Sequence, residues 1–448
     1  NSLVGSEMCI RDSGTVDRES LATALHLGWI PAPRTIHAHA RKLEPGTLLS
    51  FGLDGTESRR VYWSAEERAR AQAGRFEGDR AEAATRLDSL LTEAVRLRMQ
   101  ADVPVGVFLS GGVDSSLIAA LMTREASEPV HSFTVGFDQK GLDESAHAAA
   151  VAAHLGCVHT ELRIGESDAL ALVPALPRVF DEPFADPAAL PTLLLAQVTR
   201  RAVTVALSGD GADELFGGYG IYRSLPADWR TLSRLPSGLR RGLGGAARLL
   251  AGPAEALAAT ARWRKRRSHP GFRLGRAAET LEAGGLADLL GLHYTRWRGM
   301  PRPVPRALGR PPLFQGAGPA LADPALAVML LDCRGYLPDD LCVKTDRATM
   351  AASLEARLPF LDPAVADFAW SLPTAHKIEG DTGKMVMREL LYRLVPRPLV
   401  DRPKMGFEVP VGRWLRGALR DWADDLLSEA RLSRQGWFDA PLIARCWS

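Results

Sequence analysis

SGGVDSS, residues 110–116, is the stretch that decides the fold, because it joins a buried strand pattern to the start of a helical one. The apolar run before it, Val105–Leu109, is typical of a strand inside a sheet. The two glycines of SGGVDSS allow a sharp turn and a close approach of bare N–H groups to an anion. The helix that follows presents a positive dipole end to the same point. The stretch therefore predicts a phosphate-binding loop.

A simple turn with an Asp or Ser helix cap is the plain alternative. Such a cap needs one polar residue, so it would leave the paired glycines and paired serines of SGGVDSS unexplained. Because no GK[ST] sequence follows the glycines, the loop is not of the Walker A type. The serines supply hydroxyl donors, and the carboxylate of Asp114 is a ligand suited to a Mg²⁺ ion on bound phosphates.

Strands and helices alternate outward from this loop. We predict further strands at Val130–Phe137, Cys157–Ile164 and Val203–Leu207, and helices at Ser115–Met122, Ala146–Leu155 and Pro191–Arg201. An amphipathic helix with Leu87, Leu91 and Val95 at helical spacing precedes them. The chain after about Ser224 is largely helical in pattern. The prediction is an α/β fold with a doubly wound, mostly parallel sheet, helices on both faces, and a largely helical C-terminal part.

A second motif, SGDGADELFGGY (residues 208–219), follows the strand Val203–Leu207. Its acidic and glycine residues are poor for packing and suit a metal and substrate site on a tight backbone. Gly/Asp turns are common, but this motif is long and directly follows a strand. In doubly wound sheets, ligands bind beyond the carboxyl ends of the strands. Both motifs are predicted to lie there.

These two motifs, followed by SLEARLPFLD (353–362) and RPKMGF (402–407), resemble the asparagine synthetase family in order and spacing. The resemblance runs from about Leu25 to the C-terminus. The loop SGGVDSS is similar to that of the N-type ATP pyrophosphatases. The resemblance implies ATP and Mg²⁺ as cofactors. It implies that a carboxylate attacks the α-phosphate, pyrophosphate leaves, and ammonia converts the adenylated carboxylate to an amide.

The resemblance also implies roles for individual residues. An ATP site is expected at Leu109, Ser110, Gly111, Gly112, Asp114, Ser115, Ser116, Val135, Ser208 and Gly209. Asp114 and Asp213 match the Mg²⁺ carboxylates, and Lys404 matches the catalytic lysine. Asp210 stands where some members carry Glu, and we include it as a catalytic residue whose contact is open. Lys344, Asp346 and Arg347 either orient the acceptor or pair with Glu355 and Arg357.

The acceptor implied by the family is the β-carboxylate of aspartate, which gives asparagine. Relatives that amidate other carboxylates, such as uronic acids, or that close a β-lactam ring would share the same ATP motifs. A tRNA-modifying ATP pyrophosphatase is an alternative of another class. Its RNA-binding surface and reactive cysteines are not indicated by the formal net charge of +2 or by the scattered cysteines. A non-catalytic fragment is a third alternative.

Composition indicates a reduced, cytoplasmic protein and gives no electrostatic case for a nucleic-acid partner; the small-molecule substrates are those that the resemblance implies. Apolar residues make up 46% and charged residues 24%, which is ordinary for a globular protein. No apolar run reaches the roughly 18 residues of a membrane helix. The five cysteines form no CxxC pair. The Arg-rich run at 262–267 is interpreted as a solvated helix face rather than a nucleic-acid contact.

We expect three segments along the chain. Residues 1–13 are interpreted as an artefactual leader, and residues 14–65 as the remnant of the C-terminal end of a glutaminase domain. Residues 66–448 form the expected synthetase domain, truncated at its C-terminus. Family members use an N-terminal Cys to release ammonia from glutamine. The sequence does not start with this Cys, so we expect this chain to use free ammonia. The expected partners are these substrates and the missing glutaminase domain, with a homodimer allowed.

Overall fold

A parallel sheet of five strands lies at the centre of the computed structural model, which describes residues 15–137, 143–260, 270–307, 321–402 and 409–447. Its strand order is β5-β4-β3-β6-β7, and every neighbouring pair is parallel. The strands are β3 (Val105–Phe108), β4 (His131–Phe137), β5 (Val158–Ile164), β6 (Val205–Leu207) and β7 (Glu355–Arg357). The doubly wound sheet and the four predicted strands are confirmed, each with slightly shorter ends than expected.

Strand β7 was not predicted from the sequence. Its three residues, Glu-Ala-Arg, lie inside the SLEARLPFLD motif and carry no apolar run. Nevertheless β7 pairs with β6, with Leu207 opposite Arg357. This edge strand is therefore specified by tertiary pairing rather than by a local hydrophobic pattern.

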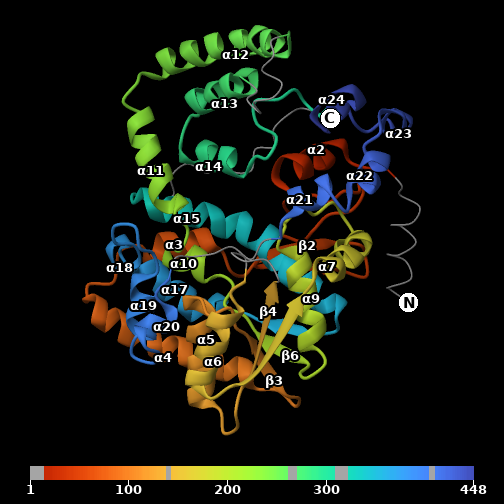
Figure 1. Cartoon of the computed structure of the whole chain (residues 1–448). Coiled ribbons are helices and arrows are strands. Elements are labelled where there is room, and N and C mark those ends of the chain that lie inside the picture. The colour runs from red at the N-terminus through yellow and green to blue at the C-terminus, as the bar shows by residue number, and fades with distance from the viewer. Residues whose placement is uncertain (1–14, 138–142, 261–269, 308–320, 403–408, 448) are drawn as a thin grey trace.

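Each face of the sheet is covered by its own hydrophobic core. Successive side chains of a strand point to opposite faces, so Val107 and Leu207 enter one core whereas Phe108 and Ala206 enter the other. Figure 1 shows the two layers of helices on either side of the strands. The first core includes α4 (Arg80–Met99), α5 (Val113–Glu125), α6 (Ser145–Leu155) and α19 (Met385–Leu391). The second includes α7 (Glu166–Leu172) and α9 (Ala189–Thr199).

The strand order places a topological switch point between β3 and β6. From β3 the chain continues through β4 and β5 toward one edge of the sheet, and β6 and β7 then extend it toward the other edge. The loops that leave β3 and β6 consequently emerge side by side, with no crossover helix between them. This is where doubly wound proteins bind their ligands.

The remainder of the described chain is mainly helical, as predicted. In Figure 1 the long helix α12 (Ser237–Thr260) and α13 (Pro270–Glu282) lie together, far from the sheet. The Arg-rich run at 262–267 lies outside the described residues. None of the helices in the described ranges is both long enough and apolar enough to cross a membrane. Other helices of the described chain include α2 (Arg18–Leu27), α10 (Ala212–Phe216), α15 (Pro324–Arg334), α16 (Val343–Ala351), α17 (Pro363–Ser371) and α18 (Thr374–Lys377).

The N-terminal segment packs on the rest of the chain. Its helix α2 is followed by a two-stranded antiparallel ribbon, β1 (Thr47–Phe51) and β2 (Glu57–Val61). The N–H of Arg296 donates to the carbonyl of His26 at 2.6 Å, and the N–H of Ala185 donates to the carbonyl of Gly28 at 2.7 Å. Lys42 forms an ion pair with Glu182. The N-terminal segment therefore forms an interface with the rest of the described chain.

Candidate functional site

The loop after β3 is folded tightly by its glycines and serines. Gly111 has a φ of +73°, and a Cβ atom there would lie 2.8 Å from the backbone carbon of His147 in α6. The N–H of Ser110 donates to the Oγ of Ser115 at 3.1 Å, and the N–H of Gly112 donates to the Oγ of Ser110 at 3.3 Å. Only glycine combines this conformation with this close approach.

The loop after β6 touches the loop after β3. A Cβ atom on Gly209 would lie 2.8 Å from the Cβ of Asp114 and 3.1 Å from the backbone nitrogen of Ser115. A Cβ on Gly218 would overlap the Asp213 carboxylate and the Lys384 side chain. The glycines of SGDGADELFGGY therefore let one loop close over the other. The two motifs, which are almost a hundred residues apart in the sequence, form one site.

Lys384 lies between the two aspartates of this site. Its Nζ atom is 2.7 and 2.6 Å from the two carboxylate oxygens of Asp114 and 2.7 Å from an oxygen of Asp213. Lys384 stands immediately before α19 with a φ of +59°, which is a strained, left-handed conformation for a residue with a side chain. Such strained backbone conformations persist only where surrounding contacts fix the residue, and they are common at functional sites.

The two carboxylates determine the charge of Lys384. Burial alone would lower the pKa of this lysine, since the side chain is 8% exposed. Asp114 and Asp213 outweigh burial and raise the pKa well above its ordinary value. The side chain is therefore a fixed ammonium group at the site.

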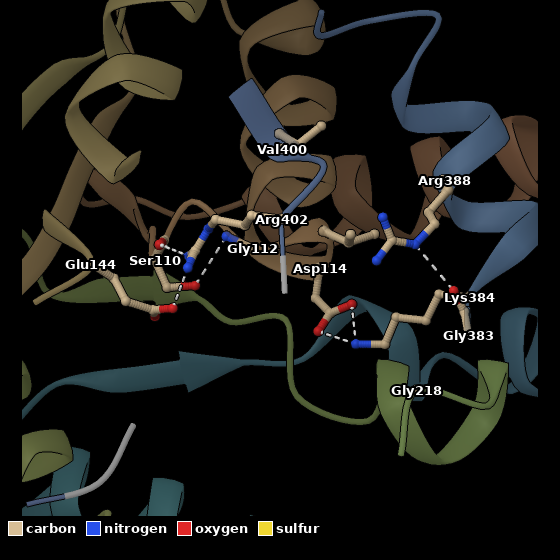
Figure 2. A pocket seen from close by; sticks show the side chains of 11 residues that line it. Ser110, Gly112, Asp114, Glu144, Gly218, Gly383, Lys384, Arg388, Val400 and Arg402 are labelled. Atoms are coloured by element: carbon tan, nitrogen blue, oxygen red, sulfur yellow. Dashed lines mark hydrogen bonds and ion pairs between the residues drawn. The ribbon is translucent and has the colours of Figure 1, made fainter. Parts of the chain in front are cut away.

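A cavity of about 140 Å³ opens beside this group. Figure 2 shows Lys384 and Arg388 on one side of it and Arg402 on the other. Arg402 pairs with Glu144 and donates to the carbonyl of Ser110 at 3.1 Å. The lining of the cavity is completed by residues of the SGGVDSS loop and by Gly218, Gly383 and Val400. Three cationic side chains and a glycine-rich helix N-terminus around one cavity favour a polyphosphate ligand.

The aspartates are suited to hold Mg²⁺ on such a ligand. Their carboxylates converge on a single point, which the Nζ atom of Lys384 occupies. Mg²⁺ is usually held by one or two carboxylates together with substrate phosphates and water. No group of three or more His, Cys, Asp or Glu side chains placed to hold a metal was found in the described ranges. The donor set of Asp114 and Asp213 therefore fits a metal that arrives with the nucleotide.

A sequence model of the family described as asparagine synthase matches residues 86–448. The chain belongs to the asparagine synthase family. It is 32% identical over 426 residues, 95% of its length, to asparagine synthetase [glutamine-hydrolyzing] 1 of Bacillus subtilis. It is 34% identical over 410 residues, 91% of its length, to the putative asparagine synthetase [glutamine-hydrolyzing] of Mycobacterium bovis. The chain spans 64% and 60% of these relatives, respectively.

Among solved structures, it matches an NH3-dependent NAD synthetase from Campylobacter jejuni in complex with the nitrate ion. The sequence identity is 20%, the TM-score is 0.23, and the match covers 33% of this chain and 64% of that one.

The residues expected at the adenosine end of an asparagine synthase site lie on or beside the three neighbouring strands β4, β3 and β6. Leu109 directly follows β3 and Val135 lies within β4, and both are buried. Ser208 follows β6, and its hydroxyl donates to Asp210 at 3.1 Å. The Thr345 hydroxyl of α16 donates to the same carboxylate at 2.7 Å. Asp210 is thus oriented by two hydroxyl groups.

Ser116 differs from the other serines of the loop. It is fully buried in α5, and its hydroxyl finds no hydrogen-bond partner among the described residues. Ser110 lines the cavity and Ser115 bonds back to Ser110. The role of Ser116 in ATP binding stays a prediction.

The three charged residues before SLEARLPFLD have partners other than those expected. Lys344 is buried and pairs with Asp186 at 2.7 Å. Arg347 pairs with Asp181 at 2.8 Å. Glu355 and Arg357 pair with each other instead. Within the described part of the chain, the second of the two alternatives, an ion network between these two sets, is therefore not found, and Asp346 is exposed.

Lys404 lies outside the described residues. Sequence reasoning missed Lys384, Arg388 and the position of Arg402 in the cavity wall. A Gly-Lys pair just before a helix, Gly383-Lys384, is the signal that could have pointed to an anion site. Nothing in the sequence indicated that this pair returns to Asp114, 270 residues earlier.

Proposed function

We propose that this chain carries the ATP-using step of amide formation. The carboxylate oxygen of an acceptor attacks the α-phosphorus of ATP. The bond from that phosphorus to the bridging oxygen breaks, and pyrophosphate leaves. Ammonia then attacks the acyl carbon, AMP leaves, and the nitrogen loses a proton to solvent. The acceptor we propose is aspartate, which gives asparagine.

The observation that carries this proposal is the contact between the two motifs at the switch point. Gly209 packs against Asp114, so the loops after β3 and β6 share one cavity with Lys384, Arg388 and Arg402. Three fixed cations oppose the charge of a triphosphate and of the pyrophosphate that leaves. The relatives named above are asparagine synthetases, which supports an acceptor carboxylate at the other end of the nucleotide.

Individual roles follow from this arrangement. The loop residues Ser110, Gly112 and Ser115 would hold the β- and γ-phosphates. Asp114 and Asp213 would hold Mg²⁺, which supplies charge neutralisation on the phosphates. Lys384 would then release the carboxylates and turn its ammonium group to the phosphates. We propose Lys404 as the group that stabilises charge on the α-phosphate and Asp210 as a residue beside the acceptor.

We extend the proposal to the whole protein. Residues 14–65 would be the end of a glutaminase domain that supplies ammonia from glutamine in the cytoplasm. The relatives, which are longer than this chain and named glutamine-hydrolyzing, support this view.

Exchange of labelled pyrophosphate into ATP tests the adenylation step. The exchange should require Mg²⁺ and one carboxylate from a panel of aspartate, glutamate, succinate and glucuronate. We expect aspartate to give the fastest exchange. Exchange with glucuronate alone would assign a uronic acid acceptor, and no exchange with any carboxylate would contradict adenylation.

A further inference from the structure

A second and larger cavity lies on the far side of the SGDGADELFGGY loop. Its volume is about 490 Å³. Gly218 lines the first cavity, whereas the next two residues, Tyr219 and Gly220, line the second. A series of contacts also leads from Asp210, in the SGDGADELFGGY motif, to the second cavity. Asp210 accepts from Thr345, and the adjacent residue Lys344 pairs with Asp186 in the wall of the second cavity.

Aromatic rings form one wall of this cavity. Trp29 meets Tyr294 edge to face with ring centroids 5.5 Å apart and Tyr336 at 5.8 Å. Tyr294 and Tyr336 are stacked at 5.1 Å, and Tyr219 meets Tyr336 at 6.2 Å. The faces of such rings attract cations within about 6 Å, and clusters of them bind ammonium groups. This aromatic wall therefore favours a cationic ligand, and the guanidinium of Arg296 is a cation that already lines the same cavity.

A buried carboxylate lies in the same cavity. Asp340 is 3% exposed, and its Oδ1 atom has no hydrogen-bond partner in the described part of the chain. The neighbouring Asp186 is occupied, because it accepts from Lys344 and from the N–H of Ala188. Buried polar atoms are nearly always paired, so an unpaired carboxylate oxygen requires an explanation. A ligand that supplies N–H donors would provide it.

The backbone around Asp340 is unusual as well. Residues Leu337–Cys342 form a π-helical turn, η3, which continues into α16. Such turns are rare and occur often at functional sites. Burial, and then the proximity of Asp186, raise the pKa of Asp340 to about 7, while Lys344 and Arg296 act to lower it. A further cation bound beside Asp340 would favour its charged form.

We propose that this cavity binds a primary ammonium group between the aromatic wall and Asp340. The ligand would be either the amino group of the acceptor or ammonium that supplies the amide nitrogen. The inference rests on the proposed amide-forming function. If the ligand is the amino group of the acceptor, an amino acid fits the cavity, whereas a uronic acid, which has no amino group, would leave Asp340 unpaired.

Asp340→Asn tests the proposal, and Asp339→Asn is the matched control. Asp339 is a buried neighbour that accepts from the N–H of Ala32 at 3.1 Å and does not line the cavity. In pyrophosphate exchange, Asp340→Asn should raise the KM for aspartate about 30-fold, the usual effect of losing hydrogen bonds to a charged group. The KM for succinate, which lacks the amino group, and the Kd for ATP should stay within twofold. Asp339→Asn should change none of these values.

Ammonium as the ligand predicts a different set of kinetic changes. If ammonium is the ligand, Asp340→Asn should raise the KM for ammonium chloride in amide formation and leave exchange unchanged. Either pattern supports the cavity and identifies the source. Equal changes for aspartate and succinate, or no change in any KM, would overturn the proposal.

A binding measurement separates this inference from the proposed function, because it needs no turnover. Methylammonium chloride should raise the melting temperature of the wild-type chain relative to potassium chloride at equal ionic strength. Asp340→Asn should lose this increase, and so should Tyr336→Leu, which removes one ring and keeps the carboxylate. An equal increase in all three proteins, or none in the wild type, would exclude the ammonium site even if no carboxylate supported exchange.

Discussion

At the residue scale, Lys384 links the unliganded arrangement to the proposed reaction. Its ammonium group lies between Asp114 and Asp213, the two side chains that would otherwise repel each other in a partly buried site. The same residue lines a cavity suited to phosphates. Lys384 would therefore exchange one set of anionic partners for another when nucleotide and Mg²⁺ bind.

Lys384→Met should destabilise the free protein and make it respond to Mg²⁺. The change leaves two carboxylates without the ammonium between them, which costs about 3 kcal/mol for a buried pair. A divalent cation at the same point should restore part of that loss. Thermal melting should therefore show a larger increase with Mg²⁺ for the variant than for the wild type. An equal response of both proteins would contradict the proposed metal position.

Lys377 provides the opposite case, a buried lysine that forms no hydrogen bond to a carboxylate in the described part of the chain. It is fully buried, its Nζ atom has no hydrogen-bond partner among the described residues, and it lies 5.2 Å from the ring centroid of Trp370. Burial lowers its pKa to about 7, with Cys333 and Asp323 opposing the change. Between about pH 7 and 10, the unfolded chain holds this proton and the folded chain does not.

Wild-type stability should consequently rise from pH 7 to pH 10 because of Lys377, since the unfolded state binds more protons there. Lys377→Met should raise the melting temperature at pH 7, and this gain should shrink as the pH approaches 10. Melting curves across this range provide the measurement. A gain that does not depend on pH would show that Lys377 does not titrate as proposed.

Lys404 is expected to act on the transition state rather than on ATP binding. If it stabilises charge that grows on the α-phosphate, Lys404→Ala should leave the Kd for ATP nearly unchanged. Its kcat should fall roughly a hundredfold or more, the usual effect of removing one preorganised electrostatic group. A rise in the Kd for ATP in proportion to the loss of rate would make Lys404 a binding residue instead.

At the scale of elements, close contact between the two loops is the structural basis of the site. Gly209→Ala would place a Cβ atom 2.8 Å from the Cβ of Asp114 and separate the loops. We expect a loss of about 1–3 kcal/mol in stability, as for other overpacked sites, and at least tenfold weaker ATP binding.

Gly245→Ala in α12 is the control for this substitution. Nothing lies within 4 Å of a Cβ atom at Gly245, so alanine should stabilise the helix by about 0.5–1 kcal/mol. Calorimetric ATP titration and chemical denaturation of both variants provide the comparison. Unchanged ATP affinity in Gly209→Ala would show that the contact is not required.

The elements that sequence patterns predicted are those with strong local signals. The run before SGGVDSS is apolar on both faces, and strand β3 and helix α5 follow it as expected. Edge strand β7 has no such signal, because the sequence Glu-Ala-Arg contains no apolar run. Its extended conformation depends on pairing with β6. Lys384 could not be placed, because its role depends on a contact with Asp114 that only the folded topology creates.

At the scale of the whole molecule, the N-terminal segment shares a surface with the rest of the described chain. Leu27 and Trp29 line the second cavity together with Tyr219, Tyr336 and Asp340. The proposed ammonium site therefore lies between the segment interpreted as the end of a glutaminase domain and the site proposed for ATP. Because Gly218 lines the first cavity and Tyr219 the second, the acceptor and the nucleotide would meet across this loop.

Transfer of oxygen from the acceptor tests the central claim most directly. With aspartate labelled with ¹⁸O in its β-carboxylate, attack on the α-phosphorus leaves one labelled oxygen in the AMP that is released. Mass spectrometry of the products after turnover with ATP, Mg²⁺ and ammonium chloride measures this. The proposed function predicts labelled AMP and unlabelled pyrophosphate. Labelled inorganic phosphate together with ADP would show attack on the γ-phosphate and contradict it.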